Sequence, residues 1–323
     1  MENTATVRFP CVSVIIPARN EAANIANVIK AILRQTPDNS ELEVILVDDG
    51  SKDNTVAVAR AAGALVIEAG LPETAGNPAA ARNRGAIAAR GDPLIFLDAD
   101  CVVGKGWLQA ILAAHARGET VVGGSLDLPA GLPATARCDY YCGWYLAHSR
   151  RSAGYVPHQP APNLSIRRQV FFDSSGFEEL PFFYACEERA WQAELRAKGH
   201  HIYFEPRAVA YHYNRPGLRN LLSRNYRWGY SAIESKHKTG SARFAWLYRY
   251  PRLLIVASLP LAFVHTAYIL ACWIRAGIYE PVIMLPLVLV SRFAYSTAMM
   301  IGGIQWLRQD GDSSFVQRPQ PKG

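Results

Sequence analysis

Residues 94–100 read Leu94-Ile95-Phe96-Leu97-Asp98-Ala99-Asp100, so four apolar residues run directly into two carboxylates. A buried strand would carry Asp98 and Asp100 to its carboxyl end, where open α/β sheets bind their ligands. Residues two apart lie on the same face of an extended backbone, so both carboxylates can serve one site. Oxygen ligands at this position suit a divalent cation held against a diphosphate. Asp residues also end strands as turn formers and helix caps, so this stretch alone leaves both interpretations open.

The chain before this stretch alternates strand and helix patterns, which predicts an α/β fold with a mostly parallel central sheet. Strands are expected at residues 12–16, 43–47, 64–67 and 93–97. Helices are expected at residues 25–33, 53–60 and 78–89. Polar clusters follow three of the strands, at residues 17–21, 48–51 and 98–100. Parallel strands bring these clusters to one edge, and together they fit a nucleotide crevice better than three unrelated turns.

Composition and missing motifs narrow the function classes. The chain has 323 residues, half of them hydrophobic, and a formal net charge of +7. Many basic residues fall between residues 196 and 252, just before the most apolar part of the chain, which favours a membrane surface over nucleic acid. No Gly-x-Gly-x-x-Gly follows the first strand and no P-loop sequence is present, so neither dinucleotide nor P-loop binding is indicated. The N-terminus has no apolar core of a secretory signal peptide.

Four motifs in register resemble the family 2 glycosyltransferases, which have the GT-A fold. They are Val14-Ile15-Ile16-Pro17-Ala18-Arg19-Asn20-Glu21, Val47-Asp48-Asp49-Gly50-Ser51-Lys52-Asp53-Asn54-Thr55, Ala81-Arg82-Asn83-Arg84-Gly85 and Leu97-Asp98-Ala99-Asp100. Each motif is weak alone, but their order and spacing match as well. The resemblance covers residues 10–240, and the segment at 161–168 resembles the one that closes over the donor sugar in that family.

The resemblance implies a nucleotide-sugar site and a metal, Mg²⁺ or Mn²⁺. The implied nucleotide-sugar ligands in these motifs are Pro17, Asn20, Glu21, Asp48, Asp49, Arg82, Asp98 and Asn163. Asp48 would contact the base, expected to be uracil. Asp100 would ligate the metal directly, while Asp98 would hold ribose or sugar hydroxyls and is the second carboxylate of the metal motif. The metal would neutralise the leaving diphosphate as a Lewis acid.

A second acidic cluster, Glu187-Glu188, begins a predicted helix that runs to residue 198. It resembles the segment that carries the catalytic base in inverting members, with Glu188 in the place of an Asp and Glu187 as the second candidate. Such a base takes a proton from the acceptor hydroxyl, and adjacent acids raise one another's pKa. The alternative is acid at a helix N-terminus, stabilised by the macrodipole. A lipid phosphate acceptor would need no strong base.

Histidine and basic residues complete the implied site. His212 lies where the family has a His that joins the metal or diphosphate, although a His in an aromatic strand is often a packed core residue. Residues 224–228 partly resemble a Gln-x-x-Arg-Trp motif, with Arg224 in the Gln position. Arg227 would brace the diphosphate and Trp228 would stack on a sugar. An amphipathic helix on anionic lipid explains the same residues equally well.

Two apolar stretches follow, at residues 253–274 and 281–307, each long enough to cross a bilayer. Arg292 interrupts the second at a cost of roughly 2.5–3.5 kcal/mol on insertion scales, so that stretch either spans or lies partly in the interface. We expect two spans with both outer ends cytoplasmic, since basic residues flank those ends. A buried helical pair in a soluble domain is the alternative. The expected divisions are a catalytic domain at 1–245, a membrane region at 246–308 and a disordered tail at 309–323.

The sequence therefore predicts an inverting, metal-dependent glycosyltransferase with a cytoplasmic GT-A domain on the inner membrane. It would move a sugar from a nucleotide donor, expected to be UDP-linked, to a lipid-linked or polysaccharide acceptor, with no nucleic-acid partner. A sugar nucleotidyltransferase is the first alternative, but that class has a Gly-rich basic loop where residues 17–21 stand. A non-catalytic membrane scaffold is the second, and the intact acids at both clusters argue against it.

Overall fold

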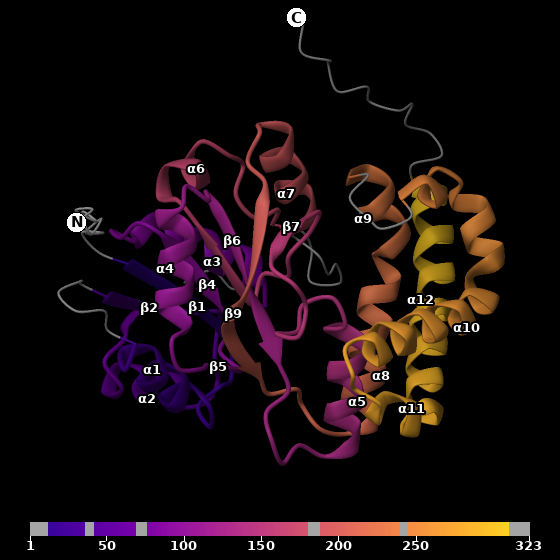
Figure 1. The fold of residues 1–323 in the computed structure, drawn as a ribbon, viewed down its shortest axis with the longest axis horizontal. Coiled ribbons are helices and arrows are strands. Elements are labelled where there is room, and N and C mark those ends of the chain that lie inside the picture. Colours follow the sequence, from indigo (N-terminus) through magenta and orange to yellow (C-terminus); the bar gives the residue numbers. More distant parts are fainter. Residues whose placement is uncertain (1–11, 36–41, 69–75, 180–187, 240–244, 310–323) are drawn as a thin grey trace, which may run out of the picture.

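The computed structural model describes residues 12–35, 42–68, 76–179, 188–239 and 245–309. The described strands are β1 Val12–Ala18, β2 Leu42–Asp48, β3 Leu65–Glu68, β4 Leu94–Leu97, β5 Cys101–Val103, β6 Val121–Asp127, β7 Gly154–Val156, β8 Asn163–Ile166 and β9 Ile202–His212. They form one mixed sheet in the order β3-β2-β1-β4-β8-β6-β9-β5, with β7 paired to β9 as well (Figure 1). This arrangement is the GT-A fold, as the sequence predicts.

Helices cover both faces of the sheet. The helices before residue 200 are α1 Ile25–Leu33, α2 Thr55–Ala61, α3 Pro78–Ala88, α4 Trp107–Ala116, α5 Ala134–Gly143, α6 Arg168–Phe172 and α7 Glu188–Ala197. Neighbouring residues of β1 point to opposite faces, so Val14 and Ile16 pack with α1, α2 and α4, while Ile15 packs with α3, α6 and α7. Because β1 is covered on both faces, its sequence is a continuous apolar run rather than an alternating one.

The sheet changes direction beyond β4. β1 to β4 are parallel, but β8 lies antiparallel between β4 and β6. The sequence predicts two short strands at 201–204 and 208–213, whereas the structure has one strand, β9, whose register against β6 shifts between Gly124 and Ser125. The outer edge of β9 pairs with β7 near its start and with β5 near its end. The pairing of β5 with β9 brings the chain after Asp100 next to His212.

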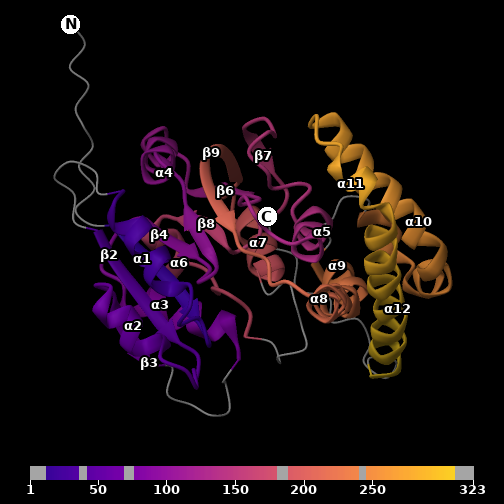
Figure 2. The ribbon, with the colours of Figure 1, turned by 90° about the horizontal axis from the view of Figure 1, so that it is seen from below.

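A helical layer stands beside the sheet, next to α5 (Figures 1 and 2). It consists of α8 Leu218–Tyr230, α9 Ala232–Thr239, the 3₁₀ helix η2 Ala245–Arg249, α10 Pro251–Arg275, α11 Glu280–Ile283 and α12 Leu285–Gln309. The helices α10 and α12 are long and apolar enough to cross a membrane, judged by length and composition only. The predicted boundary at residues 245 and 246 falls at the start of η2. Of the predicted disordered tail at 309–323, Gln309 is the last residue of α12, and residues 310–323 lie outside the described residues.

The helix α12 packs closely along α8. A Cβ added at Gly229 would lie 2.0 Å from the carbonyl oxygen of Tyr295, and one added at Gly302 would lie 2.0 Å from that of Tyr230. Only glycine permits these two backbone approaches. The helix that carries Arg224 and the second apolar helix are therefore fixed to each other.

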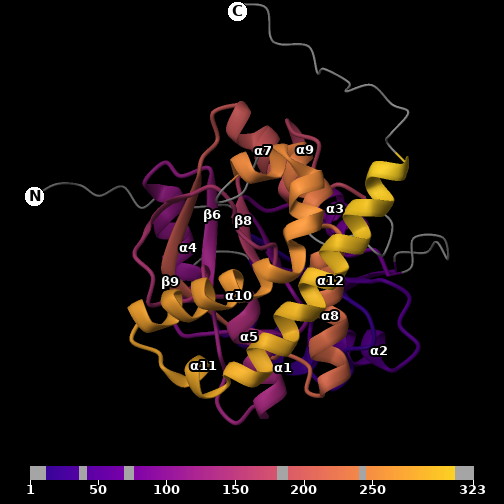
Figure 3. The same cartoon turned by 90° about the vertical axis from the view of Figure 1, so that its right-hand side faces the viewer.

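The helix α10 contacts the rest of the protein along its whole length. Near its start, Leu254 packs in a cluster with Ile233 of α9. Near its end, Trp273 Nε1 donates to the Tyr141 carbonyl of α5 at 2.9 Å. In α11, Glu280 accepts a 2.7 Å hydrogen bond from the Tyr141 hydroxyl. Figure 3 shows α10 and α12 lying across one side of the molecule rather than projecting from it.

Candidate active site

A cavity of about 1230 Å³ begins at the carboxyl ends of β1, β2 and β4 and extends to the helical layer. Strand ends supply one wall, while α5, α7, α8, α9 and the long helices α10 and α12 supply the others. The predicted site residues that line it are Pro17, Asn20, Glu21, Asp49, Arg82, Asp98, Asp100, Glu188, His212, Arg224, Arg227 and Trp228. One space thus collects residues that are up to 211 positions apart, from Pro17 to Trp228.

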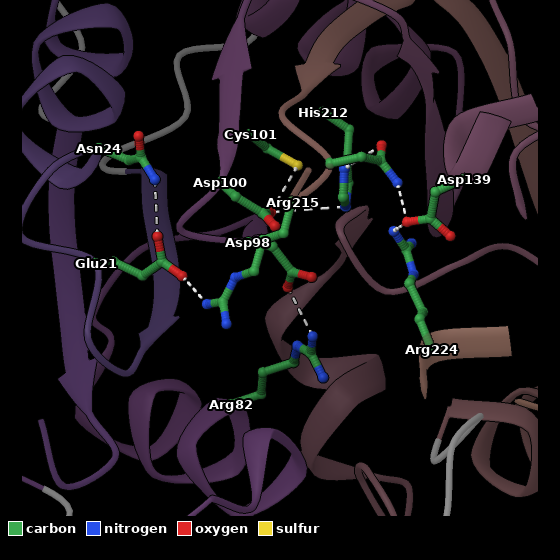
Figure 4. Close-up of polar contacts among 11 residues, drawn as sticks. Glu21, Asn24, Arg82, Asp98, Asp100, Cys101, Asp139, His212, Arg215 and Arg224 are labelled. Carbon is green, nitrogen blue, oxygen red and sulfur yellow. Dashed lines mark hydrogen bonds and ion pairs between the residues drawn. The ribbon is translucent and has the colours of Figure 1, made fainter. Parts of the chain in front are cut away.

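Asp100, Cys101 and His212 form a candidate metal centre, with one ligand atom of each within 4.8 Å of the others. The antiparallel pairing of Cys101 with His212 places the imidazole beside the carboxylate that follows β4. The Oδ1 atom of Asp100 lies 3.6 Å from Nε2 of His212 (Figure 4). Burial, with the nearby carboxylates, raises the pKa of the Cys101 thiol. That thiol is therefore neutral and lies 3.8 Å from Asp100 Oδ1 as a weak donor.

Asn214 sets the tautomer of His212. The Asn214 amide nitrogen donates to Asp139 at 2.6 Å, so its oxygen, 3.0 Å from His212 Nδ1, accepts a proton from that nitrogen. Nε2 then carries the lone pair and points it toward Asp100. This is the arrangement in which a metal-ligating histidine donates its other N–H to a neighbouring polar group. The carboxylate and imidazole therefore fit a divalent cation.

Asp98 has a different partner. Its Oδ1 atom lies 2.7 Å from the guanidinium of Arg82, whose side chain is almost fully buried on α3 (Figure 4). Asp98 is not among the three clustered residues of the candidate metal centre, so its role as a second metal ligand stays a prediction. Its carboxylate lines the cavity with Arg82, which suits its other predicted role, a contact to a sugar or ribose hydroxyl.

Two loops close the far end of the cavity. Asn20, in the left-handed backbone region at φ 57°, accepts a hydrogen bond from the Lys52 N–H at 2.7 Å and donates its own N–H to Ser51. Glu21 receives a 2.9 Å bond from Asn24 and pairs with Arg215 (Figure 4). The contacts of Asn20 tie the loop after β1 to the loop after β2, and the pair with Arg215 ties it to the chain after β9. The crevice expected at that sheet edge is therefore held in place by side chains of both loops.

The adjacent carboxylates Asp48 and Asp49 have separate environments. Asp48 accepts a 3.1 Å hydrogen bond from the Ser51 N–H, and it does not line the cavity. Asp49 lines the cavity, and burial raises the pKa of its carboxyl. Of this predicted pair, Asp49 lines the cavity, whereas Asp48 is bonded within the turn.

Glu188 begins α7 and is buried at the cavity wall. Its Oε1 atom lies 2.6 Å from His158 Nε2. Burial lowers the pKa of His158 to about 4, so the neutral imidazole donates its N–H to the carboxylate. Although burial opposes it, this hydrogen bond, together with the nearby positive charge of Arg189, lowers the pKa of Glu188. The sequence predicts a raised pKa from a neighbouring acid instead, and that neighbour, Glu187, lies outside the described residues.

Arg224 is held between two aromatic rings. Its guanidinium carbon lies 4.9 Å from the ring centre of Trp144 and 4.4 Å from that of Trp228. It also donates to Asp139 at 2.6 Å (Figure 4). The Trp144 ring lies 5.0 Å from the His212 ring. A continuous set of contacts therefore joins the candidate metal centre to α8, in keeping with the cation–π preference of Arg.

Comparison with known proteins identifies the family. A family profile described as "Glycosyl transferase family 2" matches residues 13–172. The glycosyltransferase AglE of Haloferax volcanii is 30% identical over 234 residues, which are 71% of this chain and 75% of AglE. The chain belongs to glycosyl transferase family 2. A pre-mycofactocin glycosyltransferase of Mycobacterium tuberculosis is 28% identical over 73% of this chain, which spans 52% of that longer relative.

Solved structures support the GT-A fold of this family 2 glycosyltransferase. The mannosyltransferase PcManGT from Pyrobaculum calidifontis, in complex with GDP-Man and Mn²⁺, has a TM-score of 0.62 at 21% identity, over 93% of this chain and 88% of that one. GalNAc-T7, with UDP, GalNAc and Mn²⁺, has a TM-score of 0.52 at 17% identity, over 76% of this chain and 54% of that one. At these identities the likeness carries the fold and not the substrate.

The predicted donor contact from Asn163 in this glycosyltransferase needs correction. Its side chain is fully buried on β8 and does not line the cavity. The amide nitrogen donates to the carbonyls of Ser125 and Ala208, and the oxygen accepts from Trp107 Nε1 at 3.0 Å. With these groups already bonded, Asn163 joins β8, β6, β9 and α4 and has no contact to offer a sugar.

Other cavity residues of the glycosyltransferase are absent from the sequence prediction. They are Asp139, Trp144, His158, Arg215, Lys236 and Arg292. Asp139 and Trp144 belong to the stretch at 130–155, rich in Tyr, Trp and Arg, whose composition is the one available signal for them. His158 and Arg215 lie in loops, and only the tertiary fold brings them to Glu188 and Glu21.

Proposed function

We propose that this family 2 glycosyltransferase is an inverting enzyme that moves a sugar from a UDP-linked donor to a hydroxyl of a lipid-linked acceptor at the membrane. One observation carries this proposal. A carboxylate–imidazole pair, Asp100 with His212, and an ionised buried carboxylate, Glu188, line the same cavity. The first pair suits the diphosphate of a donor, and the second group suits the proton of an acceptor.

The donor is assigned to the end of the cavity formed by the strand ends. Pro17, Asn20 and Asp49 would surround the base and ribose, and Asp98 with Arg82 would hold hydroxyl groups. The relatives of this fold include one solved with GDP-Man and one with UDP, so both nucleotides belong in a donor screen. The expectation of UDP rests on the family resemblance of residues 47–55.

Positive groups near the candidate metal centre would neutralise the diphosphate. Arg224, Arg227 and Arg215 line the cavity beside it, and guanidinium groups bind phosphate oxygens in a forked geometry. Asp100 and His212 would hold Mn²⁺ or Mg²⁺, which supplies further charge neutralisation of the leaving diphosphate when bound. Mg²⁺ prefers an all-oxygen shell, so the imidazole favours Mn²⁺.

Glu188 would act as the base. Its carboxylate accepts the proton of the acceptor hydroxyl while that oxygen forms a bond to the anomeric carbon and the bond to the diphosphate breaks. A single displacement of this kind inverts the anomeric configuration. The hydrogen bond from His158 keeps Glu188 ionised and oriented before the acceptor arrives. Arg189, the next residue along α7, lines the same wall.

The experiment is a donor screen on the purified full-length protein with Mn²⁺ or Mg²⁺. Calorimetry with UDP-, GDP- and dTDP-sugars should show binding of one nucleotide class, and slow donor hydrolysis should release that nucleotide. Failure to bind or hydrolyse any nucleotide-sugar would contradict the proposal. Release of pyrophosphate from a nucleoside triphosphate would instead indicate a nucleotidyltransferase.

We also propose that α10 and α12 attach the enzyme to the cytoplasmic face of the inner membrane. Their packing favours an arrangement in which both helices lie within one leaflet over one in which each spans the bilayer. Leu254 and Trp273, about 28 Å apart on α10, both contact earlier parts of the chain. A spanning α10 would place one of these contacts across a hydrocarbon core about 30 Å thick. Large apolar side chains are exposed along this hairpin, including Val256 at 81% and Ile283 at 82%.

A further inference from the structure

Two cations line the end of the cavity that is formed by the helical layer. Lys236 of α9 has its Nζ atom 3.0 Å from the Tyr248 hydroxyl and 3.3 Å from the Tyr295 hydroxyl. Arg292 of α12 is 1% exposed, and its guanidinium carbon lies 5.1 Å from the centre of the Tyr295 ring. Both side chains line the cavity, and Tyr295 lies between them.

The partners of these two cations are neutral. Arg292 donates to Asn225 and to Ser291 Oγ, and Lys236 donates to the two tyrosines. Within the ranges that the structure describes, neither cation forms an ion pair with a carboxylate. Two like charges in a buried place carry a large desolvation cost unless an anion compensates them. This end of the cavity therefore has a positive charge excess that the described side chains do not neutralise.

An unsatisfied donor lies next to Lys236 in the chain. The Ser235 hydroxyl is buried and has no hydrogen-bond partner among the described residues. Ser235 lines the cavity and precedes Lys236 in α9. Buried polar groups normally have partners, so this donor and the two uncompensated cations together indicate a ligand with acceptor oxygens.

The walls around the cations are apolar. Leu254, Leu261 and Val264 of α10 and Met299 of α12 line this part of the cavity. Val264 is 61% exposed, so one residue reaches both the cavity wall and the outer surface of α10. A ligand at this place would set an anionic group on the cations and an apolar group along α10. A soluble glycan offers no apolar part for such walls.

We propose that Lys236 and Arg292 bind the phosphate group of an amphiphilic acceptor, whose hydrocarbon chain lies along α10. This assignment rests on the proposed function, because the sugar would reach the acceptor from the opposite end of the same cavity. The donor diphosphate does not explain the site, since the three arginines beside the candidate metal centre already serve that end. The phosphate is held by charge-assisted hydrogen bonds from the ammonium and guanidinium groups.

The test measures binding of geranylgeranyl phosphate and of geranylgeraniol to the full-length protein in detergent micelles. We expect the phosphate to bind about tenfold tighter than the alcohol, and Lys236→Met to remove most of that difference. Lys236→Arg should retain it. Arg292→Gln, which keeps a group able to bond Asn225, should weaken phosphate binding in the same way. Arg252→Met removes an exposed cation at the start of α10 and serves as the control.

Two outcomes of this test and two further measurements decide the interpretation. Equal affinity of the wild-type protein for phosphate and alcohol would overturn the assignment, as would unchanged phosphate binding in both Lys236→Met and Arg292→Gln. Inorganic phosphate alone should compete weakly, because the apolar walls would then be empty; strong competition would show a site for free phosphate and contradict the lipid assignment. UDP and GDP binding with Mn²⁺, measured on the same samples, reports separately on the donor site, so its loss would count against the proposed function alone.

Discussion

His158 donates a hydrogen bond to the Glu188 carboxylate across 2.6 Å, at the wall of the cavity that also contains Asp100. A buried carboxylate in this setting is ionised and fixed in direction before substrate binds. The contact joins the loop before β8 to the first turn of α7, which are 30 residues apart. The first two predictions concern this pair.

Glu188→Gln should lower sugar transfer by about 10²–10⁴-fold, the usual contribution of a positioned base. The amide cannot accept the acceptor proton, although it keeps the size of the side chain. Donor affinity, measured by calorimetry, should stay within about twofold of wild type. Glu194→Gln is the matched control on the same helix, where Glu194 pairs with Lys198. Undiminished transfer by Glu188→Gln would exclude Glu188 as the base and favour an acceptor that needs none.

The rate of transfer should stay constant as the pH falls from neutrality to the pKa of an ordinary carboxyl group. Glu188 has a lowered pKa, so it stays ionised there, and protonation removes activity only at lower pH. His158→Phe removes the hydrogen bond, so burial then dominates and raises the pKa of Glu188. The loss of activity at acid pH should therefore begin about one pH unit higher or more. The dependence of kcat/KM on pH measures where this acid limb, the fall in activity at low pH, begins. His201→Phe, at an exposed position, should leave it in place; an unmoved limb in His158→Phe would contradict the assignment.

Asp100→Asn and His212→Phe should each weaken Mn²⁺ binding in the presence of UDP, because each removes a ligand of the candidate centre. Asn214→Ala should reduce Mn²⁺ affinity by about 10–100-fold through the lost tautomer control of His212. Titration followed by the Mn²⁺ spin signal measures all three. Cys101→Ser changes the third residue of the candidate centre, whose thiol is a neutral donor to Asp100, and should bind Mn²⁺ nearly as wild type because the hydroxyl keeps that donor. Equal losses in all four variants would indicate general damage to the strand end.

The position of α10 relative to the bilayer can be decided by cysteine labelling. Trp246→Cys and Tyr279→Cys place thiols before and after α10, at positions that are 61% and 64% exposed. If the helices lie in one leaflet, a membrane-impermeant maleimide should label both thiols from the same side of the membrane. Labelling from opposite sides would show that α10 spans. The unsubstituted protein gives the background from its native cysteines.

Asn163→Ala should destabilise the protein by about 2–5 kcal/mol, since it leaves two carbonyls and the Trp107 N–H without partners in the sheet. Thermal unfolding of the purified protein measures the loss. Below the unfolding temperature, donor affinity should match wild type. A large loss of donor affinity in a fully folded variant would return Asn163 to the donor site. Asn220→Ala, at an exposed position on α8, controls for the loss of an amide.

The first half of the fold can be predicted from the sequence because each strand is marked by residues within it or directly after it. Each apolar run ends in a turn cluster, and parallel pairing brings those ends together whatever the detailed register. Asp100 and Glu188 stand out for the same reason, since Asp100 follows the apolar run of β4 and Glu188 begins α7.

Long-range pairing explains what the sequence does not predict. β5 has only three residues and forms because β9 offers an edge, yet that pairing puts Cys101 beside His212. β9 reads as two strands because Glu205, Pro206 and Arg207 interrupt its apolar pattern, but the register shift against β6 absorbs them. Asn163 looks like a site residue in sequence, and only its three buried partners show that it holds the sheet together.

The glycine contacts between α8 and α12 also bear on how this enzyme can be produced. A soluble version cut at residue 245, as hydropathy suggests, would keep Arg224 but lose the helix whose backbone touches Gly229. It would also lose Arg292 and the apolar wall of the cavity. In such a truncated protein, the face of α8 that packs against α12 would be exposed to water. The smallest active enzyme should therefore include residues up to the end of α12.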